Sequence, residues 1–193
     1  MALVPITPPT LEPVTLADAK AHLRVDATDE DALISRLITG ARSELERSLG
    51  RALITQSWTY LLDAWPHSYA VPLPLAPVQS IESVRIYGPD DSSSVLPPGS
   101  YLLDGLGSPA RLIRRGTLPW AAPQRLGNGI AIDFTAGHGS LPTDVPAALR
   151  IATLILIAHW YENRQLADTG GGAGASLPPM VRDLIDPYRV RRI

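Results

Sequence analysis

Cysteine is absent from this chain of 193 residues. Its absence excludes disulfides, thiolate zinc sites and cysteine nucleophiles, and it fits a reducing compartment. A charge excess is missing as well, since the formal net charge is −2 and the isoelectric point lies near 6.1. Sequence-reading nucleic-acid binders usually carry a strong basic excess, so the composition gives no reason to expect one.

Long hydrophobic runs are also missing. The longest apolar run extends from Ile151 to Ala158, whereas a membrane-spanning helix needs about 20 apolar residues. The first 13 residues lack a positively charged start and are interrupted by Pro5, Pro8 and Pro9, so they do not form a signal peptide. We expect an extended arm over residues 1–13 and no membrane partner.

What is present at the N-terminal side is helical periodicity. Thr15 followed three residues later by Asp18 has the form of a capping box, which predicts a helix over 15–24. Thr28 with Asp31 repeats this pattern before a longer helix over 28–49. Gly50 follows at the position where glycine commonly ends a helix.

The C-terminal side predicts two more helices joined by a flexible tether. Either Thr143 or Asp144 is placed to cap a helix over 144–166, and a shorter helix is expected over 178–187. Between them, residues 169–176 are rich in glycine, which loses the most backbone entropy on ordering.

The middle of the chain, about 54–143, contains most of the prolines and loses the helical period. Short runs of strand-forming residues alternate there with turn signals, which indicates an inserted, mostly antiparallel β-region. The expected strands are Trp58–Leu62, Ile81–Tyr87, Ser100–Leu103, Ala110–Arg114 and Ile130–Thr135. The sequence therefore predicts an α+β fold, with one main domain over 14–168.

The last segment, 177–193, has the pattern of an element that docks on a partner. Its apolar side chains recur at helical spacing, and basic side chains close the chain. We assign to this docking surface Met180, Val181, Leu184, Ile185, Tyr188, Arg189, Arg191 and Arg192. The motivation is an amphipathic element that follows a tether, so that it would fold on binding.

Three candidate sites were weighed and set aside. His159 and Glu162 are spaced to share a helix face, but a carboxylate-bridged metal site requires further ligands that the sequence lacks. His138 and Ser140 suggest a hydrolase, yet Ser140 is not in the central position of a Gly-x-Ser-x-Gly turn. A helix-turn-helix over 15–49 would present an acidic turn to DNA phosphates. We therefore expect no catalytic residue, metal or cofactor.

Six stretches in a fixed order carry a resemblance over about residues 14–190. They read TLADAKAHLRVDATDEDALISRLITGARSELE with GRALITQSW, then LPLAPVQSIESVRIYG, AIDFTAGHG, VPAALRIATLILIAHWYENRQ and LIDPYR. Together they resemble the head-to-tail connector, or adaptor, family of long-tailed bacteriophages and gene transfer agents. Each stretch alone is a packing signature, and their order gives the resemblance its specificity.

The resemblance implies a structural protein of the virion or particle neck, present in the bacterial cytoplasm during assembly. Copies form a ring, typically of twelve, under the portal protein, with tail-completion or stopper proteins on the other side and double-stranded DNA passing through. We expect Trp58, Trp65 and Trp120 in contacts between subunits or with the tail. Two alternatives stay open at this point: a protein-binding adaptor module outside virions, and a hydrolase using His138 and Ser140.

Overall fold

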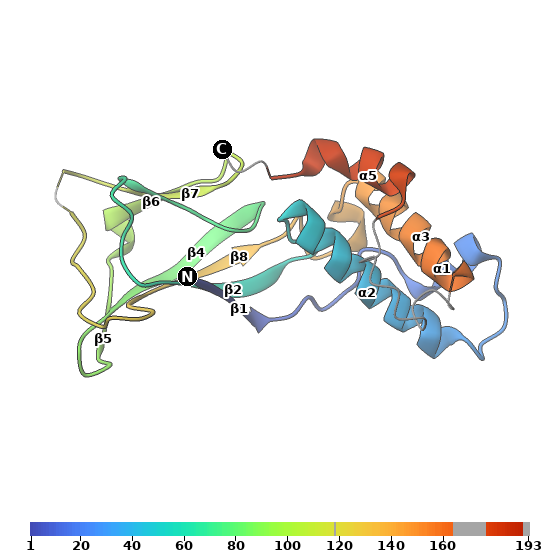
Figure 1. Ribbon diagram of the computed structural model, residues 1–193, viewed down its shortest axis with the longest axis horizontal. Coiled ribbons are helices and arrows are strands. Elements are labelled where there is room, and N and C mark those ends of the chain that lie inside the picture. Colours follow the sequence, from blue (N-terminus) through green and yellow to red (C-terminus); the bar gives the residue numbers. More distant parts are fainter. Residues whose placement is uncertain (118, 164–176, 191–193) are drawn as a thin grey trace.

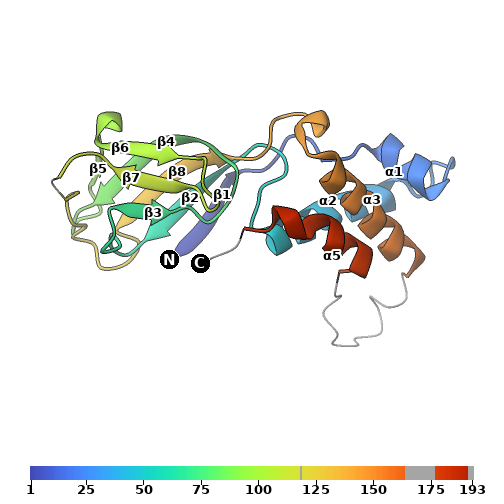
Figure 2. The same cartoon turned by 90° about the horizontal axis from the view of Figure 1, so that it is seen from above.

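The protein is elongated, with helices at one end and strands at the other (Figure 1). The computed structural model describes residues 1–117, 119–163 and 177–190. The α+β class predicted from the sequence is confirmed. The chain enters the β end first, crosses to the helices, returns for the inserted β-region and finishes among the helices (Figures 1 and 2).

The helical end is built from four α-helices within the described residues. They are α1 Leu16–Leu23, α2 Asp31–Leu49, α3 Ala147–Glu162 and α5 Pro179–Ile185. Short 3₁₀ turns lie at Pro98–Ser100, Pro142–Asp144 and Asp186–Tyr188.

The starts and ends of these helices test the capping predictions. The capping box of Thr15 and Asp18 is present, and Gly50 ends α2 in the left-handed conformation with φ 66°. The predicted cap at Thr28 is wrong, because α2 begins at Asp31 and the residue before it, Glu30, makes no capping hydrogen bond through its side chain. The acidic turn thus favours the helix start by charge alone.

The start of α3 also differs from the prediction. Asp144 lies in a 3₁₀ turn, and Pro146 occupies the N-cap position, so neither Thr143 nor Asp144 caps α3. This helix ends at Glu162, with Asn163 as its C-cap, so the predicted end at 166 is wrong. The predicted tether over 169–176 lies outside the described residues.

Two antiparallel sheets form the other end. The larger has the strand order β1-β2-β8-β4-β5, and the smaller has the order β3-β7-β6. The strands are β1 Ala2–Thr7, β2 Gln56–Leu62, β3 Ala70–Pro72, β4 Val78–Tyr87, β5 Ser93–Val95, β6 Tyr101–Asp104, β7 Arg111–Arg114 and β8 Ile130–Ala136. All five predicted strands are present, with bounds that move by at most three residues.

Three strands were not predicted, and the N-terminal arm is one of them. Residues Ala2–Thr7 are extended as expected, but they pair with β2 as the edge of the larger sheet. The three-residue strands β3 and β5 are too short for an alternating pattern to show.

Each end has its own hydrophobic core. In the helical end, buried side chains of α2 such as Ile38 and Leu45 pack against Leu149 and Leu156 of α3. In the β end, Phe134 and other inward-facing side chains of β8 lie between the two sheets. The two cores meet where α2 leads into β2 and where β8 leads into α3 (Figure 2).

Candidate interaction surfaces

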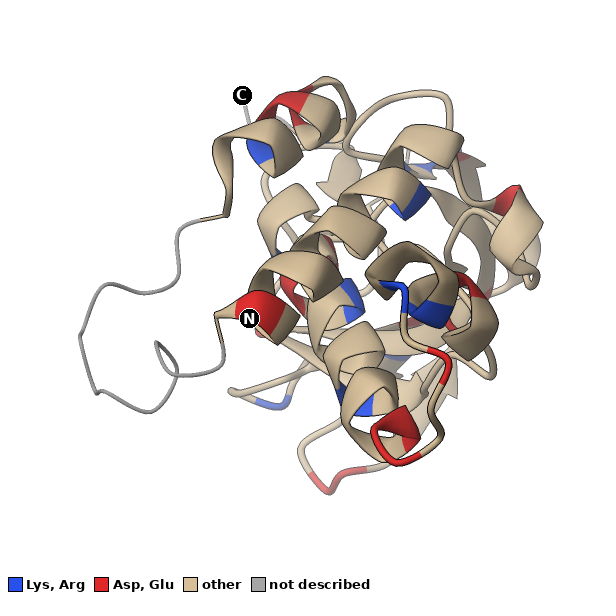
Figure 3. Cartoon of the chain, turned by 90° about the vertical axis from the view of Figure 1, so that its right-hand side faces the viewer, with Lys and Arg blue, Asp and Glu red and all other residues tan. Residues whose placement is uncertain are grey.

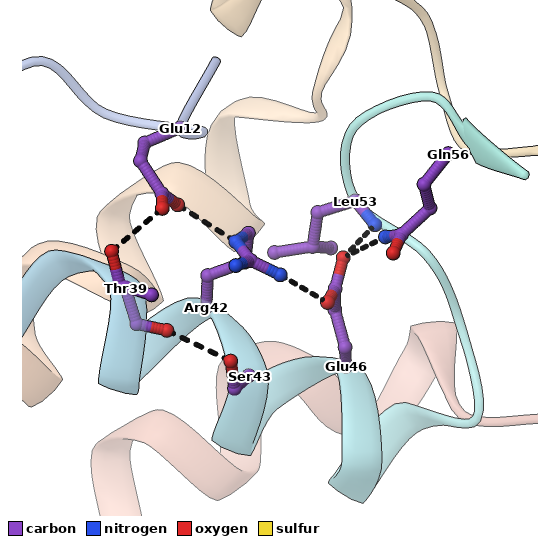
Figure 4. Close-up of polar contacts among 7 residues, drawn as sticks. All are labelled: Glu12, Thr39, Arg42, Ser43, Glu46, Leu53 and Gln56. Carbon is purple, nitrogen blue, oxygen red and sulfur yellow. Dashed lines mark hydrogen bonds and ion pairs between the residues drawn. The ribbon is translucent and has the colours of Figure 1, made fainter. Parts of the chain in front are cut away.

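Glu46 joins the helical end to the β end. It lies on α2, and its carboxylate accepts hydrogen bonds from the Leu53 backbone N–H at 2.8 Å and from the Gln56 side chain at 2.7 Å. Its other oxygen pairs with Arg42 at 2.8 Å, and Arg42 pairs in turn with Glu12 at 2.7 Å (Figure 4). The network therefore connects the segment before α1, helix α2 and the start of β2.

The pKa of Glu46 reflects the burial of its carboxyl group. Burial raises the pKa of the Glu46 carboxyl above its usual value, although the Leu53 N–H and the Arg42 guanidinium favour the charged form. A buried carboxylate that satisfies two donors from the β2 side fixes how the two ends of the molecule are oriented.

The second connection between the ends is the turn after β8. Gly137 has φ 140°, and a Cβ atom there would lie 2.5 Å from the Thr55 backbone nitrogen. A Cβ at Gly139 would lie 2.2 Å from an Asp144 carboxylate oxygen. Both glycines are therefore required by close packing of the turn, which accounts for this glycine-rich stretch without a catalytic role.

The geometry around His138 and Ser140 does not support a hydrolase. The His138 Nε2 atom is buried, and within the described residues it has no hydrogen-bond partner. Burial and then the neighbouring Arg51 guanidinium lower the pKa of His138. Ser140 is exposed, and no hydrogen bond to His138 is seen in the part of the chain that the structure describes. A nucleophile and its base need to be within hydrogen-bond reach.

His159 and Glu162 are both exposed near the end of α3. A His159 ring nitrogen lies 3.4 Å from the Asn163 side-chain amide. Among the residues that the structure describes, no three potential ligands gather to hold a metal ion. None of the helices described there is long and apolar enough to cross a bilayer.

The three tryptophans singled out by sequence lie in the β end. Trp65 and Trp120 lie against each other with ring centroids 4.4 Å apart and ring planes inclined by 45°, and the Trp65 indole donates to the Ala121 carbonyl at 2.9 Å. Trp58 is half-buried in β2, apart from this pair in the sequence, and its indole nitrogen has no partner among the described residues. All three pack against the β core, so their apolar surface already contributes to the chain's own fold.

The C-terminal segment packs on the chain itself. Val181 and Ile185 are fully buried in the helical core, and Leu184 and Tyr188 pack against it. Met180 is different, since 63% of it is exposed. The apolar side of α5 is thus covered by the helical core of the same chain, and within the predicted docking surface Met180 is the apolar side chain that stays exposed.

Hydrogen bonds then tie the chain that follows α5 to the end of α2. The Val190 N–H donates to the Leu49 carbonyl at 3.0 Å, and Arg189 reaches the Ser48 hydroxyl at 3.3 Å. Arg191 and Arg192 lie outside the described residues. The described part of the segment is therefore held near the middle of the molecule, beside the turn that links α2 to β2.

The turn between α1 and α2 is as acidic as the sequence suggested, and part of its charge is already paired. Asp31 forms an ion pair with Lys20 at 2.6 Å, and Glu30 accepts a hydrogen bond from Tyr161. Seen from the helical end, acidic and basic residues are interspersed (Figure 3). This distribution does not resemble the basic surface of a DNA-reading helix pair.

Sequence reasoning missed two apolar surface features at the helical end. One is a half-open groove of about 390 Å³ between the segment before α1 and one side of α2. The other is the side of α3 that carries Ile151, which is 49% exposed. Hydrophobic periodicity predicts which residues share the apolar face of a helix. It does not predict which of these residues the rest of the chain leaves exposed.

Comparison with known proteins gives one family and one structural group. The family model described as head completion protein matches residues 12–191. No curated protein matches the chain in sequence at a significant level.

Three similar solved structures come from gene transfer agent particles. A chain in a structure titled as the neck of an empty GTA particle computed with C6 symmetry is 27% identical with a TM-score of 0.82. A chain from the virion of a native gene transfer agent particle is 26% identical with a TM-score of 0.83, and one from a native neck computed with C12 symmetry is 26% identical with a TM-score of 0.81. Each alignment covers 100% of this chain and 97% of the other.

Proposed function

The chain belongs to the head completion protein family, and we propose that its copies form a ring, of twelve subunits, in the neck of a virus-like particle. There it is a structural connector between the head and the tail. The twelve-fold number is supported by the C12 symmetry of one native neck that contains a similar chain.

The observation that carries this function is the similarity over the whole chain. The neck chains match in sequence and fold across both the helical end and the β end, so no additional domain requires a separate function. The described residues contain no catalytic geometry at His138 and Ser140, which favours a mechanical role without catalysis or a cofactor. Nothing in the fold favours the alternative of an adaptor outside virions.

The contact with the portal protein is a separate part of the proposal. We propose that the C-terminal segment faces the portal protein, with exposed Met180 and the arginines Arg189, Arg191 and Arg192 making the contact. Val181, Leu184, Ile185 and Tyr188 would support that surface from inside the helical core.

The β end would then face tail-completion or stopper proteins. The contact between Trp65 and Trp120 would support the loop that contains Leu126, which is 97% exposed, and Trp58 would pack against the β core from β2. Double-stranded DNA would pass through the ring without base-specific contacts, consistent with the mixed charge of the chain.

Removing the gene tests the function directly. We expect DNA-filled heads that lack tails, and a supplied copy of the gene should restore tailed particles. Imaging of restored necks should show a ring of this chain, with the C-terminal segment toward the portal and the β end toward the tail. Normal tailed particles without the gene would refute the connector role, whereas a ring in the opposite orientation would refute only the assignment of partners.

A further inference from the structure

The central helix of the helical end, α3, is apolar over most of its surface, with Arg150 as the charged residue of its first half, and the fold covers only part of it. Helices α1, α2 and α5 pack around α3, and the buried side of α3 faces α2, where Trp160 lies against Gly40. At about 100° per residue, a second apolar strip lies on the opposite side. It consists of Ala147, Ile151, Leu154, Ile155 and Ala158.

In this strip, the outer face of α3, Ala147 and Ile151 are exposed and Ala158 is half-buried. Leu154 and Ile155 pack partly against the chain's own helical core, and part of each side chain stays accessible. The apolar face of a helix is normally buried against another element. The next charged position on this side is Glu162, at the end of the helix. The outer face of α3 therefore has the composition of a contact that is completed by another protein.

The groove beside α2 offers a second, different surface. Its lining includes Pro9, Leu11 and Leu16 from the segment leading into α1, Ser35 and Ile38 from α2, and Pro142. The groove is bounded by α2, whereas the outer face of α3 points away from α2. A ring formed by head-to-tail contacts needs two such unlike surfaces on each subunit.

Charge does not oppose bringing these surfaces together. The charged side chain in the groove is Glu12, and its carboxylate is already bound by Arg42 at 2.7 Å and by Thr39 at 2.8 Å. Covering the groove with an apolar helix would therefore not bury an unpaired charge.

The edges of the larger sheet are less suited to joining subunits. Pro5 lies in the edge strand β1, where it removes a backbone donor, and the opposite edge β5 has three residues. A sheet continued from subunit to subunit would be short at one edge and interrupted at the other.

We propose that the outer face of α3 in one copy packs into the groove beside α2 in the next copy. This inference rests on the ring proposed above and adds which surfaces close it. The occupant of each surface is a second copy of this chain, because one head-to-tail contact covers both surfaces and repeats around the ring.

The lack of cysteine makes a crosslinking test clean. Particles would be assembled with the double variant Ile151→Cys, Ser35→Cys and treated with a short bis-maleimide reagent. We expect a ladder of covalent oligomers that reaches the full ring, because each subunit then links to two neighbours. The matched control pairs Ile151→Cys with Leu106→Cys, a fully exposed position at the β end, and should give no ladder.

A second variant tests the contact without crosslinking. Ile151→Asp places a charge on a half-exposed position, so the protein should fold with an unchanged melting temperature. We expect at least a tenfold loss of its incorporation into necks, and normal incorporation for Leu106→Asp, which changes a fully exposed leucine in the loop between β6 and β7.

The outcomes separate this inference from the proposed function. A ring visible in the necks, but without crosslinks between positions 151 and 35, would overturn the inference and leave the connector role intact. Covalent dimers of Ile151→Cys alone would also overturn it, because they would indicate a symmetric contact. Necks without any ring of this chain would refute both proposals.

Discussion

The helical end and the β end differ in how completely each encloses its own core. Two sheets face each other across Phe134 and its neighbours, and the β core is covered by the chain itself. The helical end surrounds α3 on three sides and leaves Ile151 half exposed. The core of the β end is therefore enclosed within one subunit, and its most exposed leucines, Leu106 and Leu126, lie in loops outside that core. At the helical end, by contrast, exposed Ile151 belongs to the core helix α3 itself.

The largest effect should come from opening the enclosed core. Phe134→Ala removes the only phenylalanine of the chain, which is fully buried, and should lower the free energy of unfolding by about 3–5 kcal/mol. Because Glu46 and the turn after β8 tie the two ends together, far-UV circular dichroism of the helices should be lost in the same transition.

The control for this comparison is Leu156→Ala in the buried side of α3. It should cost about 2–5 kcal/mol and also give a single transition. If Phe134→Ala instead melts in two steps, with the helical step at the wild-type temperature, the two ends fold independently and the junction does not couple them.

The helices could be predicted from the sequence more fully than the sheet, because a helix depends on local spacing and a sheet on distant pairing. Helix α2 was predicted because the spacing of Ile34, Ile38, Ala41 and Leu45 is a local signal. Strand β1 was read as an arm because its pairing partner, β2, lies more than 50 residues further along the chain. A sheet edge is decided by such distant pairing, which periodicity does not report.

The exposure of α5 and α3 also depends on packing between distant parts of the chain. The apolar side of α5 was read correctly as a pattern, but the pattern could not show that α3 of the same chain covers Val181 and Ile185. Conversely, the sequence predicts a helix over 144–166, and only the arrangement of α1, α2 and α5 around α3 shows that Ile151 is left outside.

The next largest effect should come from the junction. Glu46→Leu keeps a similar volume but leaves the Leu53 N–H and the Gln56 amide without their acceptor. Each unsatisfied buried donor costs about 1–3 kcal/mol, so chemical denaturation should show a loss in that range or somewhat above it. Glu44→Leu on the same helix, whose carboxylate pairs with exposed Arg47, is the matched control and should change stability little. Equal losses in the two variants would mean that the network does not hold the ends together.

A smaller effect is expected within the helical end alone. Thr15→Ala removes the hydroxyl that accepts the Asp18 N–H at 3.0 Å and should cost about 1 kcal/mol in thermal unfolding. Thr15→Ser keeps the acceptor and should recover most of this loss. If alanine and serine behave alike, the capping box is present without stabilising α1.

The smallest effect should be a dependence on pH that comes from Glu46. Its folded pKa is raised by burial from the ordinary value of 4.5, so between that value and the folded pKa the native state binds more protons than the unfolded state. Stability contributed by this group therefore falls as the pH rises through that window and is regained as the pH is lowered. The effect is limited because Leu53, Arg42 and Gln56 favour the charged carboxylate and offset part of the burial.

Glu46→Gln cannot titrate, so the difference in unfolding free energy between wild type and this variant should shift in favour of the wild type as the pH falls. A difference that stays constant, or that moves in the opposite direction, would mean that donors from β2 outweigh burial and that the junction is electrostatically more favourable than its burial implies.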